Sequence, residues 1–127
     1  MRFNMDPLWA SADIDFIGID NYMPMSDWRD GVNHLDFNDT TGPTTIYDPT
    51  YLKSNIEGGE LYSWYYLNAA DRDNQVRTNI TDGAYSKPWV FRQKDIRNWW
   101  LNQHKDRDTA GVEVASFSSW ADRKSVV

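Results

Sequence analysis

A cluster of polar and aromatic side chains in the first quarter of the chain has the residue types that bind carbohydrates. Its members are Asp20, Asn21, Tyr22, Asp27 and Trp28. Carboxylates and amides form hydrogen bonds with hydroxyl groups, and an indole ring stacks on the apolar face of a sugar. We therefore predict that these five residues line a substrate-binding site.

Two carboxylates of this cluster, Asp20 and Asp27, are the candidates for cleavage of a glycosidic bond. Such cleavage needs carboxylic groups on both sides of the bond, about 5–5.5 Å apart for retention and about 6.5–9.5 Å apart for inversion of configuration. The alternative interpretation is structural. In it, Asp27 caps a turn and Arg29 forms a local ion pair.

The element that must position the cluster is a predicted strand over residues 14–20. The run is rich in β-branched residues, and its neighbours Phe16 and Ile17 are both apolar, which is typical of a strand buried on both faces of a parallel sheet. Pro24 cannot extend the ladder. Ligand sites of α/β barrels and open sheets lie at the carboxyl ends of their strands. The residues that follow this strand therefore either face a site or form an ordinary polar turn.

Other elements are predicted along the rest of the chain. Helices are expected at residues 6–10, 48–57, 69–78 and 95–103, and a strand at residues 87–92. In the third helix Val76 is expected to point inward, and in the fourth Ile96, Trp99 and Trp100 are expected to lie along one side. Asp6 is interpreted as the cap of the first helix, and Asp48 with Pro49 as the start of the second. The segment 62–67 is compatible with either a strand or a helix.

Two segments lack a regular pattern. Residues 24–48 form a predicted long loop, and loops of this length in compact domains are usually functional or disordered. The aromatic and apolar residues of this loop indicate that it packs against the rest of the chain. The tail from His104 onward is polar and has weak periodicity, so no regular element is predicted there.

The composition limits the class of protein. The chain has 127 residues, enough for one domain with a core, and 15% of them are aromatic. Its net charge of −6 argues against binding to nucleic acid or to an anionic membrane. The absence of cysteine excludes disulfides and thiolate chemistry.

Several other kinds of site and segment are not supported. No signal peptide is visible, and no apolar run approaches the ~20 residues that cross a bilayer. Residues 36–43 vaguely resemble a calcium loop but lack its closing glutamate. His34 and His104 do not have the spacing of a zinc site, and no glycine-rich phosphate loop is present. We therefore predict neither a metal nor a cofactor.

A series of phrases resembles one particular family. They recur in order from Asp6 to about Glu113: Asp6-Pro-Leu-Trp-Ala, Ile14-Asp-Phe-Ile-Gly-Ile-Asp-Asn-Tyr-Met-Pro, Ser26-Asp-Trp-Arg-Asp-Gly31, Gly58-Gly-Glu60, Trp64-Tyr-Tyr66, Ala70-Asp-Arg72, Gln75-Val-Arg-Thr78, Ile80-Thr-Asp-Gly83 and Lys87-Pro-Trp-Val-Phe-Arg92. All of them resemble the glycoside-hydrolase-like, TIM-barrel-like domain of gene transfer agent and phage tail proteins.

The resemblance implies an α/β fold, a partial (β/α)8 barrel with long loops. Because a complete barrel needs about 250 residues, residues 6–127 are expected to be a truncated internal part of a single TIM-barrel-like domain. The family's Thr-Glu-Leu-Gly phrase has no counterpart in the diverging segment 121–127, and its other catalytic carboxylate would lie before Met1. No catalytic residue is carried over, so the resemblance leaves open whether the chain is an enzyme.

The resemblance also implies partners and a location. The expected partners are bacterial cell-wall or surface polysaccharide and other tail or baseplate proteins, with a role in host specificity. The expected location is a virion or gene transfer agent tail, made in the bacterial cytoplasm. The alternative is a carbohydrate-binding or purely structural tail module that never had catalysis.

Overall fold

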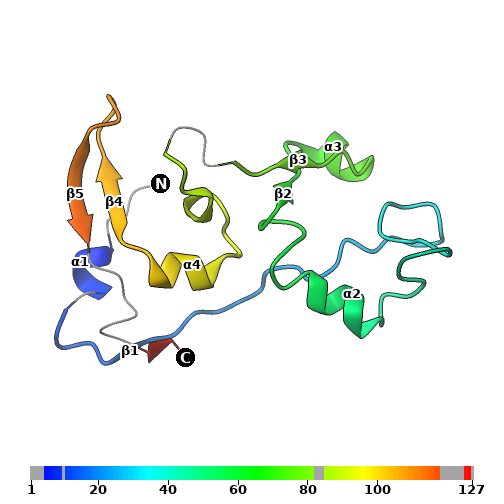
Figure 1. Cartoon of the computed structure of the whole chain (residues 1–127), viewed down its shortest axis with the longest axis horizontal. Helices are drawn as coiled ribbons and strands as arrows, with labels where there is room; N and C mark the ends of the chain where they lie inside the picture. Colours follow the sequence, from blue (N-terminus) through cyan, green and yellow to red (C-terminus); the bar gives the residue numbers. More distant parts are fainter. Residues whose placement is uncertain (1–4, 10, 82–84, 118–124, 127) are drawn as a thin grey trace. The chain divides into compact units, whose positions relative to one another are not determined.

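The computed structural model describes residues 5–9, 11–81, 85–117 and 125–126, the last three residues of the third range and the final pair by their backbone alone (Figure 1). The chain divides into two compact units, which are described separately below. Unit 1 comprises residues 1–21 and 96–127, and unit 2 comprises residues 22–95.

The described residues form short helices and strands. The helices are α1 (Asp6–Trp9), α2 (Pro49–Ser54), α3 (Ala69–Asp73), the 3₁₀ helix η1 (Pro88–Val90) and α4 (Ile96–Leu101). The strands are β1 (Phe16–Ile17), β2 (Trp64–Tyr65), β3 (Thr78–Asn79), β4 (His104–Arg107), β5 (Glu113–Phe117) and β6 (Ser125–Val126). They pair as a parallel β1–β6 and antiparallel β2–β3 and β4–β5. The predicted mixed α/β class is confirmed, but the described residues do not close a barrel.

Unit 1 has its core where β1 meets α4. Ile17 and Trp100 are buried, and they are covered by Trp9, Ile14, Ile19 and Trp99. The prediction that α4 presents its tryptophans along one side is confirmed. The prediction that the first strand is buried on both faces is wrong, because Phe16 is 64% exposed. In the described part of the chain β1 is two residues long and only Ile17 turns toward the core.

Residues 104–117 fold as a hairpin, contrary to the prediction of an irregular tail from His104 onward. β4 and β5 pair with a register shift between Asp106 and Arg107. The connecting turn is held by Asp108, whose carboxylate accepts hydrogen bonds from the backbone N–H groups of Ala110 and Val112, both at 2.9 Å. Gly111 supplies the left-handed conformation at φ +81° that the turn requires. Turn chemistry rather than alternation therefore defines this hairpin.

Asp6 does not have the predicted role of a helix cap. It is the first residue of α1, is 2% exposed, and its Oδ2 lies 2.7 Å from Nδ1 of His104. The other ring nitrogen of His104, Nε2, lies 2.7 Å from the backbone oxygen of Trp99. His104 itself is fully buried. This pair ties α1 to the first residue of β4.

In unit 2, α2 begins as predicted. The carboxylate of Asp48 accepts hydrogen bonds from the backbone N–H groups of Thr50, at 2.8 Å, and Tyr51, at 3.1 Å. The helix ends at Ser54, three residues earlier than expected. The residues beyond it are held by Lys94, whose ammonium donates to the carbonyl oxygens of Asn55 and Gly58. Burial lowers the pKa of Lys94.

Two further predictions are partly or wholly wrong. The helix expected at 69–78 stops at Asp73, because Gln75 adopts a left-handed φ of +52° that ends the helical path. Val76, expected to point inward, is 54% exposed. Residues 87–92 contain η1 instead of a strand, since Pro88 takes the first helical position and has no N–H for a ladder. The ambiguous segment 62–67 contains β2.

Residues 24–48 contain no helix or strand, as predicted, and part of the segment is packed through its aromatic rings. Trp28 lies edge-on to three rings, at centroid distances of 4.6 Å for His34, 5.7 Å for Tyr51 and 6.2 Å for Phe37. Leu35, expected to pack as well, is 62% exposed. The loop is therefore fixed at Trp28 while some of its apolar residues face solvent.

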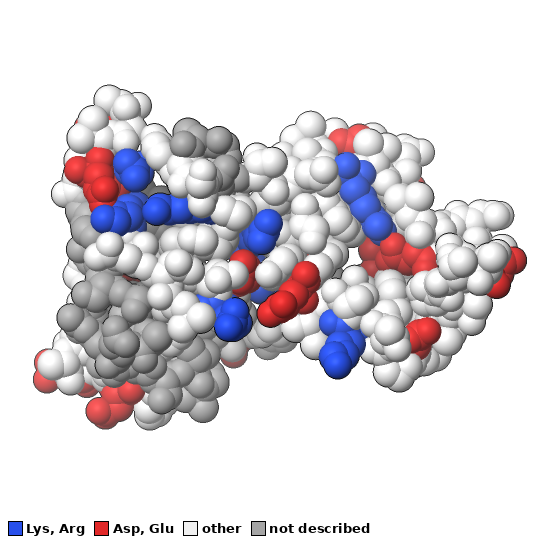
Figure 2. All heavy atoms as spheres, viewed as in Figure 1, with Lys and Arg blue, Asp and Glu red and all other residues white. Residues whose placement is uncertain are grey.

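The surface gives two further findings. On the face drawn in Figure 2, basic and acidic side chains lie close to one another and do not gather into one large basic patch. None of the helices in the described ranges has the length and apolar character needed to cross a bilayer.

Candidate functional site

The five residues predicted to line a site are divided between the two units. Asp20 and Asn21 follow β1 in unit 1, whereas Tyr22, Asp27 and Trp28 belong to unit 2. Asp20, Asn21 and Tyr22 are exposed, and Tyr22 is 89% exposed. Asp27 and Trp28 are half-buried in one cluster of unit 2. A single site built from all five remains a prediction, as does the pairing of Asp20 with Asp27.

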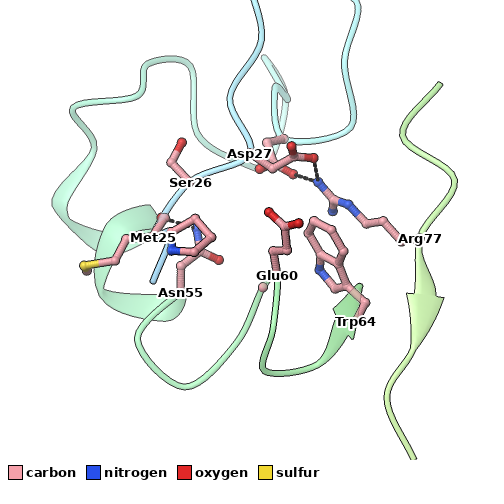
Figure 3. Close-up of a pocket in the computed structure, with 10 residues that line it drawn as sticks. Met25, Ser26, Asp27, Asn55, Glu60, Trp64 and Arg77 are labelled. Carbon is pink, nitrogen blue, oxygen red and sulfur yellow. Dashed lines mark hydrogen bonds and ion pairs between the residues drawn. The ribbon is translucent and has the colours of Figure 1, made fainter. Parts of the chain in front are cut away.

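Arg77, directly before β3, is the centre of this cluster (Figure 3). Its Nη2 lies 2.9 Å from Oδ2 of Asp27 and 2.5 Å from Oδ1 of Asp36. The guanidinium carbon lies 4.2 Å from the ring centroid of Trp64, the geometry of a cation–π contact. Although burial disfavours the charge, the bonds to Asp36 and Asp27 raise the pKa of Arg77. One cation therefore bridges two carboxylates beside an indole ring.

Asp27 has a donor for each of its carboxylate oxygens. Oδ1 accepts from Nη2 of Arg29 at 3.0 Å, so the predicted local pair of Arg29 is confirmed. Oδ2 accepts from the hydroxyl of Tyr66 at 2.5 Å, from Nε2 of Gln75 at 2.8 Å and from Arg77. Burial alone would raise the pKa of Asp27, but the hydrogen bonds from Tyr66, Arg77 and Gln75 lower it. Asp27 is therefore an ionised acceptor and not a proton donor.

Asp36 links the same cluster to α2. Its carboxylate accepts a hydrogen bond from the hydroxyl of Tyr51. The same hydroxyl lies 3.3 Å from Oγ of Ser26 and accepts from the backbone N–H of Asp27, also at 3.3 Å. Burial, together with the bond to Asp36, raises the pKa of Tyr51. The tyrosine thus remains protonated and fastens both acidic segments to one helix.

This arrangement does not suit hydrolysis of a glycosidic bond between Asp27 and Asp36. A glycosidase leaves the space between its two carboxyl groups for the scissile bond or for water. Here Nη2 of Arg77 occupies that space and bonds to both groups. The acid partner would also need a raised pKa, whereas the pKa of Asp27 is lowered. The cluster neutralises charge and fixes three segments together.

A hollow of about 80 Å³ lies beside the cluster. Its lining includes Ser26, Asn55 and Glu60 together with the bridged aspartates, and Figure 3 shows the carboxylate of Glu60 pointing toward Asp27 and Arg77. A hollow of this size holds a few water molecules but no sugar ring. Among the described residues, no group of three or more His, Asp or Glu side chains is placed to hold a metal ion.

Sequence reasoning missed most members of this cluster. Asp36 was interpreted only as the start of a poor calcium loop, and Tyr51, Tyr66, Gln75 and Arg77 received no role. The available signal was Arg77, a cation next to a short segment of strand composition in a chain with more acidic than basic residues. Such a cation must find an acidic partner when it is buried. Its partners are 41 and 50 residues away, which no local pattern specifies.

Comparison with models of protein families matches the chain to the GTA TIM-barrel-like domain over residues 1–127. Neither the curated proteins nor the solved structures give a match.

Proposed function

Since the chain belongs to the family of GTA TIM-barrel-like domains, we propose that it is part of a phage-like tail particle and contacts glycan of the bacterial surface or peptidoglycan. In this proposal the chain binds glycan without cleaving it. The glycoside-hydrolase-like catalytic glutamates implied by the resemblance match no residue of this sequence.

The observation that carries the proposal is the exposure of Asp20 and Asn21, which follow the carboxyl end of β1 in unit 1. The strand is parallel to β6, and ligand sites of parallel sheets lie beyond the carboxyl ends of their strands. In unit 2, Tyr22 is 89% exposed and offers a flat apolar face beside a phenolic hydroxyl. This combination suits a sugar, whose ring has both an apolar face and hydroxyl groups.

The chemistry of unit 2 favours binding over catalysis. Asp27, the carboxylate of the predicted cluster that is half-buried, is committed to Arg29, Tyr66, Gln75 and Arg77. A carboxylate with this many donors stays ionised and cannot protonate a leaving group at neutral pH.

A second candidate function is a purely structural role in the tail. It is favoured by exposed apolar side chains on the β4–β5 hairpin, where Val112 is 59% and Val114 is 61% exposed. Exposed apolar residues that gather on a surface are typical of contacts with another protein.

Co-sedimentation with purified peptidoglycan tests the proposal. The full chain is expected to bind, and Tyr22→Ala to bind about tenfold more weakly, which is the loss of about 1.4 kcal/mol from one ring contact. The matched control is Tyr47→Ala, since Tyr47 is 83% exposed at a different position of unit 2 and should bind like the unchanged chain.

Two results would contradict the proposal. Absence of binding to peptidoglycan and to surface polysaccharide would favour the structural role. Release of reducing sugar by the full chain, lost on Asp20→Asn, would show catalysis where we propose binding alone.

A further inference from the structure

We propose that a second groove in unit 2, separate from the Arg77 cluster, binds a neutral saccharide unit. The groove has a volume of about 320 Å³ and is lined by Leu61, Tyr65, Asn79, Ile80, Thr81, Phe91 and Gln93. This volume lies in the range of small-molecule sites. The inference rests on the proposed function for the glycan as ligand, and it adds a site in a different part of the unit.

The walls of the groove come from three segments that are tied together by backbone hydrogen bonds. β2 pairs with β3 through Tyr65 and Thr78. Beyond this ladder, the N–H of Ile80 donates to the carbonyl of Ser63 at 2.9 Å. The third wall is attached by the N–H of Lys94, which donates to the carbonyl of Leu61 at 3.0 Å. The groove is therefore formed before a ligand arrives, which reduces the entropic cost of binding.

The lining selects an uncharged ligand. None of the seven lining residues carries a formal charge, although 25% of the whole chain is charged. Two aromatic rings, Tyr65 and Phe91, supply apolar faces, and Phe91 is 48% exposed. The amides of Asn79 and Gln93 are exposed, and each donates and accepts hydrogen bonds. Rings beside amides suit a molecule with an apolar face and a rim of hydroxyl groups.

Leu61 adds a second observation at the same place. It adopts a left-handed φ of +64°, which is unusual for a residue with a bulky side chain. Two backbone hydrogen bonds hold this conformation. The N–H of Leu61 donates to the carbonyl of Trp64 at 2.8 Å, and the carbonyl of Leu61 accepts from the backbone N–H of Lys94. Residues held in such conformations by their surroundings concentrate at ligand sites. The strained residue lies in the lining of the groove and not in a remote turn.

The contrast with the hollow beside Arg77 strengthens the assignment. That hollow is about 80 Å³ and is lined by Asp27, Asp36, Glu60 and Arg77. The groove is larger and uncharged. A charged peptide would find no counter-charge in the groove, and a sugar ring would not fit the hollow.

The test is a titration of the full chain with the trimer of N-acetylglucosamine, followed by nuclear magnetic resonance of side-chain amides. The amide signals of Asn79 and Gln93 are expected to shift. Phe91→Ala and Gln93→Ala should each weaken binding about tenfold while circular dichroism remains unchanged. Tyr47→Ala is the matched control for an exposed ring outside the groove.

The outcomes separate this inference from the proposed function. If the chain binds peptidoglycan and loses it on Tyr22→Ala but not on Phe91→Ala or Gln93→Ala, the groove is not a glycan site and the proposed function stands. If the chain binds neither the trimer, nor peptidoglycan, nor surface polysaccharide, both are wrong. Unchanged Asn79 and Gln93 signals with the trimer, or equal shifts with a neutral hexapeptide, would also overturn the groove's assignment.

Discussion

Asp27 in unit 2 and Asp6 in unit 1 are both withdrawn from water, yet their pKa values move in opposite directions. Burial raises the pKa of both carboxyls. At Asp27 this is outweighed by hydrogen bonds from Tyr66, Arg77 and Gln75, and the pKa is lowered. At Asp6 burial prevails over the single partner His104, and the nearby charge of Asp106 adds to it, so the pKa is raised. The number of donors, more than burial itself, decides the protonation of these aspartates.

The partners of His104 show what the raised pKa of Asp6 means. A carbonyl oxygen only accepts hydrogen bonds, so the contact with Trp99 assigns a proton to Nε2 of the imidazole. The contact between Nδ1 and Asp6 then needs a second proton, carried by either partner. The raised pKa of Asp6 agrees in direction with a proton carried by its carboxyl at this contact. The pKa of the buried aspartate is thus raised in unit 1 and lowered in unit 2.

The largest change in the free energy of unfolding is expected from removing the cation of Arg77 in unit 2. Arg77→Met leaves Asp27 and Asp36, 10% and 11% exposed, without their shared partner. Breaking a buried ion pair on one side costs about 3–5 kcal/mol. We expect the free energy of unfolding, measured with urea, to fall by about 3 kcal/mol, the lower end of that range, because the side chain of Arg77 is 23% exposed.

Arg72→Met is the matched control for this change. Arg72 is 58% exposed and its pairing with Asp73 is long, at 3.6 Å. An exposed pair contributes at most about 1 kcal/mol, so the control should lie within about 0.5 kcal/mol of the unchanged chain. Equal losses of stability in both variants would show that the Arg77 bridge between Asp27 and Asp36 contributes no more than an exposed ion pair.

The second prediction concerns Asp27 and the dependence of the free energy of unfolding on pH. Because the folded-state pKa of Asp27 is lowered, its contribution is present above the ordinary value of 3.8 and is lost as the pH falls through the lowered value. Asp27→Asn should cost about 2 kcal/mol at neutral pH, the scale of hydrogen bonds to a charged group. It should also flatten the acid side of the stability curve. Urea midpoints measured in steps of pH from neutral to acid give both quantities, and an acid side as steep as before would contradict the assignment.

The smallest change in the free energy of unfolding is expected from Asp6→Asn. Its dependence on pH is opposite to that expected for Asp27→Asn. The folded-state pKa of Asp6 is raised, so its contribution is present below 3.8 and is lost as the pH rises through the raised value. An asparagine amide can donate to Nδ1 of neutral His104 without an extra proton. We therefore expect the free energy of unfolding of Asp6→Asn to exceed that of the unchanged chain by about 1 kcal/mol near neutral pH.

The same urea series tests this variant. The decline that the unchanged chain shows above pH 3.8 should be reduced in Asp6→Asn and retained in Asp27→Asn. If Asp6→Asn keeps the full decline, the decline does not arise from the raised pKa of Asp6.

The predictable part of the fold is the part that local chemistry determines. Asp48 followed by Pro49 specifies the start of α2 by capping, and the spacing of Trp99 and Trp100 identifies the buried side of α4. The family was recognised from phrases that recur in order, and the match over the whole chain confirms it. These features are encoded within a few residues or in literal sequence.

The missed part depends on contacts between distant residues. Residues 87–92 have the composition of a strand, but Pro88 favours the first position of a helix and η1 forms there instead. The hairpin that begins at His104 depends on a turn stabilised by Asp108. In the candidate site, the local pair of Asp27 with Arg29 was within reach of sequence reasoning. The bridge by Arg77 was not, because a side chain's long-range partner has no periodic signature.

The order of the two units along the chain has a consequence for how the protein folds. Unit 2 is one continuous segment, whereas unit 1 is split, and the contact between Asp6 and His104 spans 98 positions. During synthesis residues 22–95 emerge from the ribosome before α4 and β4 do, so unit 2 is free to collapse first. The first segment, with α1 and β1, must wait for partners that emerge after unit 2. The cost of closing that gap grows only slowly with its length, and we expect assembly of unit 1 to be the late, slow step.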